Sequence, residues 1–393
     1  MQTDNILEVN HLKISFKTLN GIVPALRDVS FTLKKGETLA IVGESGSGKS
    51  VSTKAITGLL ANHITNVEGG EILFEGRNLL KASKADLTKI RGSEIAMIFQ
   101  DPMTSLNPVM TVGMQIAEAV MAHTKVDKNT AMRQAIDLME KVEIKDPETK
   151  AYHYPHQFSG GMRQRIMIAM ALACKPKILI ADEPTTALDV SVQARIIELI
   201  NQLKDAFDMS VIFITHDLGV VANVADRVAV MFAGRVVETG TTNEIFYHPQ
   251  HPYTWGLLEA TPTLSTEDDN LYTIPGNPPN MANLTTGDPF APRNPYALDI
   301  DFVKDPPLFQ VSKTHQAATW LLDERAPKVE LPLDIQARYV VYQDILDRQA
   351  TSAKESQLGT TTGYDLAAFE NTDAVYGPYL YDELADTIPV YES

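Results

Sequence analysis

The sequence has a single cysteine, Cys174, among 393 residues. One thiol excludes an internal disulfide and any metal site built only from cysteines. Long apolar runs are also missing, because the longest, such as Ile166 to Cys174, fall well short of the roughly twenty residues that a membrane-spanning helix needs. The residues from Met1 to Asn5 lack the basic and apolar regions of a signal peptide. We therefore expect a soluble cytosolic chain that does not cross a membrane by itself.

Positive charge is scarce. The chain has 34 Lys and Arg against 50 Asp and Glu, a formal net charge of −16. Nucleic-acid-binding proteins usually have a basic face, and no run of Lys or Arg indicates one here. No nucleic-acid partner is expected. The length suffices for about two or three domains.

The most informative segment present is a complete G-x-x-x-x-G-K-[ST] phosphate-binding loop. A short apolar strand is expected before it, over residues 38–42, and a helix after it, over residues 51–60. Such glycines let backbone N–H groups approach an anion, and the helix start adds its positive dipole. Lys49 is predicted to reach the β- and γ-phosphates and Ser50 to ligate Mg²⁺. A glycine-rich turn without a ligand would not explain why strand, loop, Lys-Ser and helix occur together. The loop residues are Gly43, Glu44, Ser45, Gly46, Ser47, Gly48, Lys49 and Ser50.

Two adjacent carboxylates follow the apolar run from Ile178 to Ala181. A strand that ends in Asp182 and Glu183 would place both at the sheet edge where the phosphate loop opens. Asp182 suits a Mg²⁺ interaction, usually through water, and Glu183 suits polarising a water for attack on the γ-phosphorus. Alone, an Asp-Glu pair after a strand is more often a solvated turn, so the preceding phosphate loop is what favours the functional interpretation.

The remaining pattern is an alternation of strands and helices. This favours a parallel sheet covered by helices, with a domain boundary near Tyr247, where the sequence becomes rich in Pro, Asn and Thr. Strands are expected at 6–16, 29–33, 71–74, 178–181, 211–215 and 228–232, and helical patterns at 114–142 and 192–207.

The segment from Phe158 to Arg165 contains Ser159-Gly160-Gly161. A serine before two glycines at a helix start predicts a second anion-binding helix terminus. An ordinary serine cap explains the helix start but not the doubled glycine. The segment resembles the signature motif of ATP-binding-cassette (ABC) ATPases, with Phe and Met as variants at its outer positions. One phosphate loop and a second such terminus in one chain suggest two chains that share nucleotides.

Further motifs extend this resemblance over about residues 6–250. Gln100 resembles the Q-loop glutamine that senses Mg²⁺ and the attacking water, and Ala187-Leu188-Asp189 resembles the D-loop. His216 resembles the switch histidine that contacts the γ-phosphate, although a lone histidine after a strand is often structural. Phe16 fits the aromatic residue that stacks on adenine, and a core position is its alternative.

The resemblance implies an α/β fold of the ABC type. It consists of a RecA-like core with an antiparallel β subdomain and a helical subdomain at about 101–165, all within a nucleotide-binding domain of residues 1–247. ATP and Mg²⁺ are the implied ligands. Glu183, His216 and Gln100 would be catalytic, Ser50, Gln100 and Asp182 would serve the metal, and Ser159 to Gly161 would cap ATP held by a partner subunit. Asp189 is counted with the nucleotide-binding residues.

A narrower resemblance rests on residues 101–108, 248–254 and 275–279. These segments are similar to the oligopeptide/dipeptide and nickel importer ATPases, and the chain is most similar to their D-type subunit. The resemblance implies a second, different ATPase as partner, two membrane permease subunits, an extracytoplasmic binding protein and a peripheral place on the cytoplasmic side of the membrane. Nickel or another solute remains an alternative cargo. A soluble non-transport cassette ATPase is the competing class, but such proteins need a long coiled coil or two tandem cassettes, and this sequence shows neither. A non-hydrolysing regulatory module is disfavoured because Glu183 and His216 are both present.

Residues 248–330 are expected to form the C-terminal domain of this family, in which many relatives bind an iron–sulfur cluster through four cysteines. The matching residues here lack thiolates, which such clusters require, so the cluster is predicted to be absent. Packing of Phe290, Tyr296 and Trp320 would support this region instead. The matching positions are Asp288, Asn294, Asp301 and Thr319.

The extension over residues 331–393 has eleven acidic and three basic residues. Helical spacing predicts a helix at about 338–350, followed by a segment that docks on a partner or on the chain itself. A solvated acidic extension is the alternative, although disordered segments are usually poorer in aromatics. Its tyrosines are Tyr339, Tyr342, Tyr364, Tyr376, Tyr379, Tyr381 and Tyr391.

Overall fold

The structure is a computed structural model that describes residues 4–19, 21–186, 188–261, 273–284 and 286–358. The chain divides into two compact units. The first comprises the described residues up to His216 together with Val224–Val236 and Pro278–Leu284, and the second comprises the other described residues. In the described part of the chain, no helix is long and apolar enough to cross a bilayer.

The first unit is built around five parallel strands, which lie in the order β9-β3-β8-β7-β6 within an eight-stranded sheet. Every residue of β3, β7 and β8 is buried, as expected for apolar strands that are covered on both faces. Because all five run in the same direction, their carboxyl ends meet at one edge of the sheet. The strands are β3 (Thr38–Val42), β6 (Ile95–Ile98), β7 (Ile178–Asp182), β8 (Ser210–Thr215) and β9 (Arg227–Phe232).

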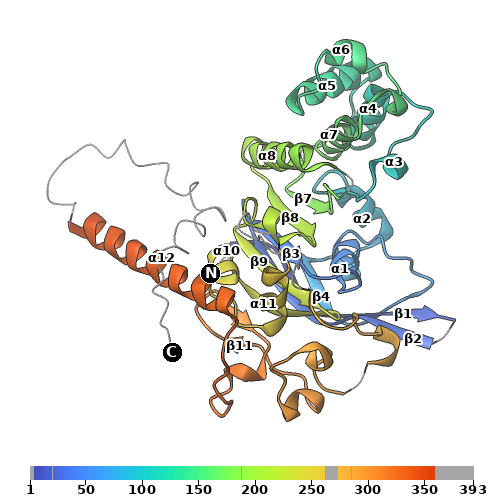
Figure 1. Ribbon diagram of the computed structural model, residues 1–393. Coiled ribbons are helices and arrows are strands. Elements are labelled where there is room, and N and C mark those ends of the chain that lie inside the picture. Colours follow the sequence, from blue (N-terminus) through green and yellow to red (C-terminus); the bar gives the residue numbers. More distant parts are fainter. Residues whose placement is uncertain (1–3, 20, 187, 262–272, 285, 359–393) are drawn as a thin grey trace. The chain divides into compact units, whose positions relative to one another are not determined.

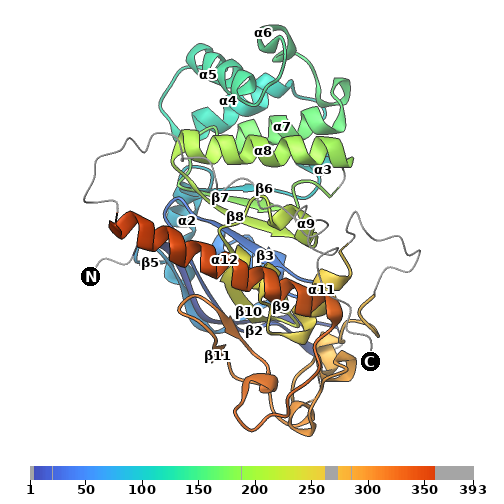
Figure 2. The same cartoon turned by 60° about the vertical axis from the view of Figure 1, so that its left-hand side comes forward.

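Helices cover this sheet, and a group of helices lies beyond α8 (Figures 1 and 2). The helical pattern expected at 114–142 is confirmed, and the structure divides it into two helices, α4 and α5. Asp127 ends the first pattern by accepting a hydrogen bond from the backbone N–H of Thr130, which caps a new helix. The helices are α1 (Lys49–Ile56), α2 (Lys84–Ile90), α3 (Pro102–Ser105), α4 (Val112–His123), α5 (Lys128–Lys141), α6 (Pro147–Lys150), α7 (Gly160–Ala171) and α8 (Val190–Phe207).

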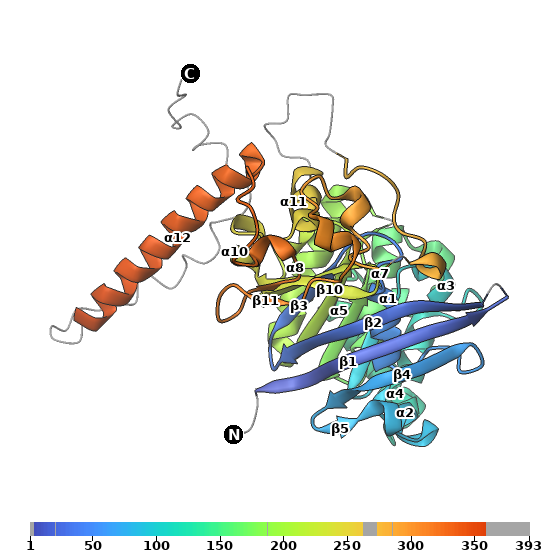
Figure 3. The ribbon, with the colours of Figure 1, turned by 90° about the horizontal axis from the view of Figure 1, so that it is seen from below.

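A second, antiparallel sheet has the order β2-β1-β4-β5 (Figure 3). Its strands are β1 (Asn5–Thr18), β2 (Gly21–Lys34), β4 (Thr65–Phe74) and β5 (Arg77–Asn78). Leu7, Leu33 and Phe74 belong to the same buried cluster as Ile41 and Ile212 of the parallel sheet. The two sheets therefore share one hydrophobic core.

The second unit is organised around the buried carboxylate of Glu238. This group accepts hydrogen bonds from the backbone N–H of Gln250 (2.6 Å) and of His251 (3.1 Å), and it lies 2.8 Å from Nε2 of His315. Next to it, the ring of Tyr253 packs edge-on against Phe290. The elements of this unit are α9 (Leu218–Val221), most of β10 (Arg235–Thr241), α10 (Thr242–Tyr247), α11 (Pro252–Glu259), β11 (Phe309–Gln310), β12 (Gln316–Ala317) and α12 (Leu333–Leu358).

Helix α12 contains the helix expected at 338–350, and its first half packs on the second unit. The Tyr339 hydroxyl donates to the Pro249 carbonyl (2.6 Å) and accepts from Nε2 of Gln250 (2.9 Å). The His248 ring lies 4.5 Å from the Tyr339 ring and stacks on Tyr342 at 4.8 Å. The sequence did not indicate this docking of the helix itself. The segment expected to follow the helix and to dock stays a prediction, because residues 359–393, with the last five tyrosines, lie outside the described residues.

Candidate nucleotide site

The phosphate-loop sequence connects the end of β3 to the start of α1. Gly43 has a φ of +145°, and a Cβ added there would lie 2.1 Å from the backbone oxygen of Met231. Gly48 also has a positive φ, +105°, at the cap of α1. A side chain at Gly43 would collide with β9, and one at Gly48 would come too close to Leu26 and Ala25 of the strand over residues 21–34, so glycine is required at both positions.

Lys49 is folded back over the loop. Its Nζ donates hydrogen bonds to the carbonyls of Gly43 (2.7 Å) and Glu44 (3.0 Å). Burial lowers the pKa of Lys49, while the nearby charges of Glu183, Asp182 and Glu44 raise it. The ammonium thus lies where it can meet an anion cradled by the loop.

The Ser47 hydroxyl is buried and has no hydrogen-bond partner within the described residues. A buried polar atom without a partner is uncommon, and an oxyanion in the loop would provide one. The donor set of this loop therefore fits a phosphate group.

Ser50 and Asp182 meet across the site, with the Ser50 hydroxyl donating to Oδ1 of Asp182 at 2.9 Å. Burial raises the pKa of Asp182, and the Ser50 hydrogen bond opposes that shift. Hydroxyl and carboxylate oxygens are ligands that Mg²⁺ accepts, with water and phosphate oxygens completing its shell. The described residues contain no group of three or more His, Cys, Asp or Glu that could hold a metal alone.

Glu183 follows β7 in a left-handed backbone conformation, with φ +48°. Its Oε2 accepts hydrogen bonds from Nε2 of Gln100 (2.9 Å) and from the Thr186 hydroxyl (3.0 Å). Nδ1 of His216 lies 3.6 Å from Oε1 of Glu183. The three residues expected to be catalytic, Glu183, Gln100 and His216, are therefore adjacent.

Thr186 was not anticipated from the sequence. The only signal for it is a hydroxyl residue three positions after the carboxylate. This spacing brings the two groups together because the chain turns back at Glu183.

Ser159, the serine of the segment that resembles the signature motif, caps α7. Its Oγ accepts a hydrogen bond from the backbone N–H of Met162 at 3.4 Å. Gly161 has a packing reason as well, because a Cβ there would lie 2.6 Å from Cγ1 of Val192 on α8. Asp189 caps α8 by accepting from the Ser191 hydroxyl (2.7 Å) and the Val192 N–H (3.0 Å), and these bonds lower its pKa. Ala187 lies outside the described residues.

Phe16 lies on β1, half-buried and packed against the shared core. Its cross-strand neighbours are Val23 and Thr65. These contacts are those of a core residue, so its stacking role stays a prediction.

The four positions matched to cluster cysteines each accept a hydrogen bond from a nearby backbone N–H. Phe290 and Trp320 next to them are buried, and Tyr296 packs edge-on against Trp255 at 5.3 Å. Such contacts support local turns. The acceptors are Asp288 (from Phe290, 3.0 Å), Asn294 (from Tyr296, 3.0 Å), Asp301 (from Leu298, 2.7 Å) and Thr319 (from Leu321, 3.3 Å).

Comparison with known proteins gives two family matches. Residues 26–186 match the ABC transporter family, and residues 237–300 match the C-terminal region of oligopeptide/dipeptide transporters. Solved structures similar to the chain include a dimeric ATP-binding cassette in a post-hydrolysis state with ADP and Pi (28% identity, TM-score 0.54, 60% of this chain and 98% of that one). Another is cbiO1 of Clostridium perfringens, part of an ABC transporter complex (29% identity, TM-score 0.55, 63% and 92%).

Whole-length relatives agree with these matches. The chain is 57% identical over 339 residues to the oligopeptide transport ATP-binding protein OppD of Bacillus subtilis, covering 86% of this chain and 95% of that protein. It is 56% identical over 346 residues to the dipeptide transport ATP-binding protein DppD of Lactococcus lactis, covering 88% and 99%. The chain therefore belongs to the ABC transporter family, among its oligopeptide and dipeptide transport ATP-binding proteins.

Proposed function

We propose that this chain hydrolyses ATP to power peptide uptake through a membrane ABC importer. The observation that carries the proposal is the position of Glu183, which is held by Gln100 and Thr186 beside His216. Glu183 directly follows β7, and the last residue of β7, Asp182, accepts a hydrogen bond from Ser50 of the phosphate-loop sequence. Transport of peptides is supported by the names of the relatives.

In this proposal the loop N–H groups and Lys49 bind the β- and γ-phosphates, and Phe16 stacks on the adenine. Ser50, Asp182 and Gln100 would hold Mg²⁺, which when bound neutralises phosphate charge. Glu183 accepts a proton from the water that attacks the γ-phosphorus, the bond from that phosphorus to the bridging oxygen breaks, and ADP and phosphate leave. His216 contacts the γ-phosphate.

A second, homologous ATPase would complete each nucleotide site. Ser159, Gly160, Gly161 and Asp189 would face the partner's nucleotide, and a similar solved cassette is described as dimeric with bound ADP and Pi. Two permease subunits and an extracytoplasmic binding protein complete the proposed importer, with this chain on the cytoplasmic face of the membrane. The proposed domains are residues 1–247, 248–330 and 331–393, and no iron–sulfur cluster is proposed in the second.

The test compares two substitutions in the assembled transporter. Glu183→Gln should retain ATP binding and lower turnover by about 10²- to 10⁴-fold, because the carboxylate acts on the water and not on the nucleotide. Lys49→Ala should lose ATP affinity first. Equilibrium binding and phosphate release measure the two effects, and near-normal turnover of Glu183→Gln would remove Glu183 as the base.

A further inference from the structure

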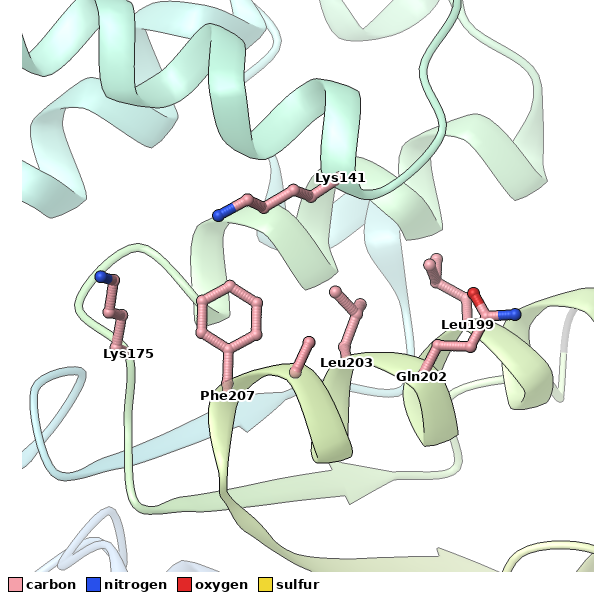
Figure 4. A pocket seen from close by; sticks show the side chains of 7 residues that line it. Lys141, Lys175, Leu199, Gln202, Leu203 and Phe207 are labelled. Carbon is pink, nitrogen blue, oxygen red and sulfur yellow. The ribbon is translucent and has the colours of Figure 1, made fainter. Parts of the chain in front are cut away.

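A cavity of about 420 Å³ lies in the first unit between the ends of two helices. The residues that line it include Lys141 at the end of α5, Lys175 in the loop before β7, and Leu199, Gln202, Leu203 and Phe207 of α8 (Figure 4). We call it the α5–α8 groove.

This groove lies away from the candidate nucleotide site. Lys175 precedes the first residue of β7, Ile178, and Phe207 precedes the first residue of β8, Ser210. The groove is therefore at the edge where the parallel strands begin. Asp182 and His216 follow the same two strands at the opposite edge.

The chemistry of the groove is apolar below and cationic above. Leu199 and Leu203 are buried at its floor. Nζ of Lys141 lies 5.2 Å from the centre of the Phe207 ring, and both ammonium groups lie at the end of the groove that holds this ring (Figure 4). Among the described residues, neither Lys141 nor Lys175 has a carboxylate partner. Unpaired cations above an apolar floor suit an anionic segment with apolar side chains.

We propose that the α5–α8 groove binds the chain's own C-terminal segment, residues 359–393. This segment has seven acidic residues and no Lys or Arg. Its run Tyr379-Leu380-Tyr381-Asp382-Glu383 places apolar side chains directly before two carboxylates. Leu380 and Tyr381 would contact the leucine floor, and Asp382 and Glu383 would pair with the two lysines.

The length of the segment permits this binding. Its 35 residues can span at most about 120 Å when extended. Because the segment is tethered to the chain, its effective concentration at the groove is in the millimolar range, so weak contacts are enough to keep it bound.

The test uses the chain truncated after Leu358 and a labelled synthetic peptide of residues 359–393. Fluorescence anisotropy should show that the peptide binds the truncated chain and that added salt weakens this binding, because exposed charges are screened. The double variant Lys141→Glu with Lys175→Glu should bind at least tenfold more weakly. The matched control, Lys128→Glu with Lys145→Glu, makes the same change of charge at two exposed lysines outside the groove.

The full chain tests whether the segment binds the groove of its own molecule. It should bind the peptide at least tenfold more weakly than the truncated chain, because its own segment occupies the groove. Circular dichroism of each variant verifies folding. Absence of binding, equal binding by the groove and control variants, or equal binding by full and truncated chains would each overturn the proposal. Self-association of the full chain that the peptide disrupts would instead assign the groove to a second copy.

Discussion

At the scale of single residues, motif order predicted which side chains lie together at the candidate nucleotide site. The places of Lys49 and Ser50 could be predicted because they belong to one short loop motif. The place of Asp182 could be predicted because it ends an apolar strand, although it lies 132 residues after Ser50. The role of Thr186 could not be predicted, because its contact with Glu183 depends on the positive φ at Glu183, and a glutamate does not indicate a positive φ. The doubled glycine was interpreted only as an anion site, whereas Gly161 also permits the close approach of Val192.

The Thr186 hydroxyl is expected to orient the Glu183 carboxylate. Thr186→Val keeps the shape of the side chain but removes one of the two hydrogen bonds to Oε2. We expect turnover to fall about ten- to a hundredfold, since a hydrogen bond to a charged carboxylate contributes about 1.5–3 kcal/mol. ATP affinity should not change, and Thr186→Ser should restore turnover. A loss of affinity equal to the loss of turnover would instead indicate damage to nucleotide binding.

Gly161 and Gly160 provide a matched pair on α7. Gly161→Ala places a Cβ 2.6 Å from Val192, whereas the nearest atom to a Cβ at Gly160 is Cδ2 of Leu188 at 3.6 Å. We expect Gly161→Ala to be less stable than Gly160→Ala by about 1–3 kcal/mol, the usual cost of overpacking. Thermal unfolding measures the difference, and Val192→Ala should reduce it. Equal stability of the two alanine variants would show that α7 and α8 can move apart without lowering the free energy of unfolding.

At the scale of elements, apolar runs predicted the parallel strands well, because strands buried on both faces contain few polar residues. The helix in the acidic extension could also be predicted from its spacing. Its docking could not, because His248 and Gln250, which receive Tyr339 and Tyr342, lie about ninety residues earlier in the chain. Such long-range pairing has no local signature.

The contact between α10 and α12 is expected to depend on pH. Burial, and then the neighbouring His315, lower the pKa of His248 below its ordinary value of 6.5. The folded state thus keeps His248 neutral, while the unfolded chain takes up a proton below pH 6.5. Stability should therefore decrease as the pH falls from about 6.5 toward the lowered pKa, by at most about 1.4 kcal/mol per pH unit for one proton.

Unfolding midpoints between pH 5 and 7 measure this effect. His248→Gln should make the dependence shallower, whereas His63→Gln, at an exposed position in the first unit, should leave it unchanged. An unchanged slope in His248→Gln would assign the pH dependence to other groups.

At the scale of the whole molecule, the first unit was predictable because its motifs lie in a fixed order on alternating strands and helices. The second unit was less so. Between α11 and α12 its described elements are short 3-10 turns and two-residue strands, which leave little periodicity in the sequence. The sequence indicated a boundary and four positions without thiols, but not the hydrogen bonds that those side chains make to the backbone.

The proposed partnership predicts an asymmetric effect of Ser159→Arg. In the proposal Ser159 faces the nucleotide of the partner ATPase, so a bulky cation there should hinder closure at the partner's site. The substituted side chain lies at the cap of α7, whereas Lys49 and its carbonyl partners belong to the loop before α1. This chain's own ATP binding should therefore persist. Nucleotide occupancy measured site by site in the assembled complex shows whether Ser159 faces the partner's nucleotide or that of its own chain. If Ser159→Arg empties the Lys49 site and leaves the partner's site occupied, Ser159 acts on the nucleotide of its own chain.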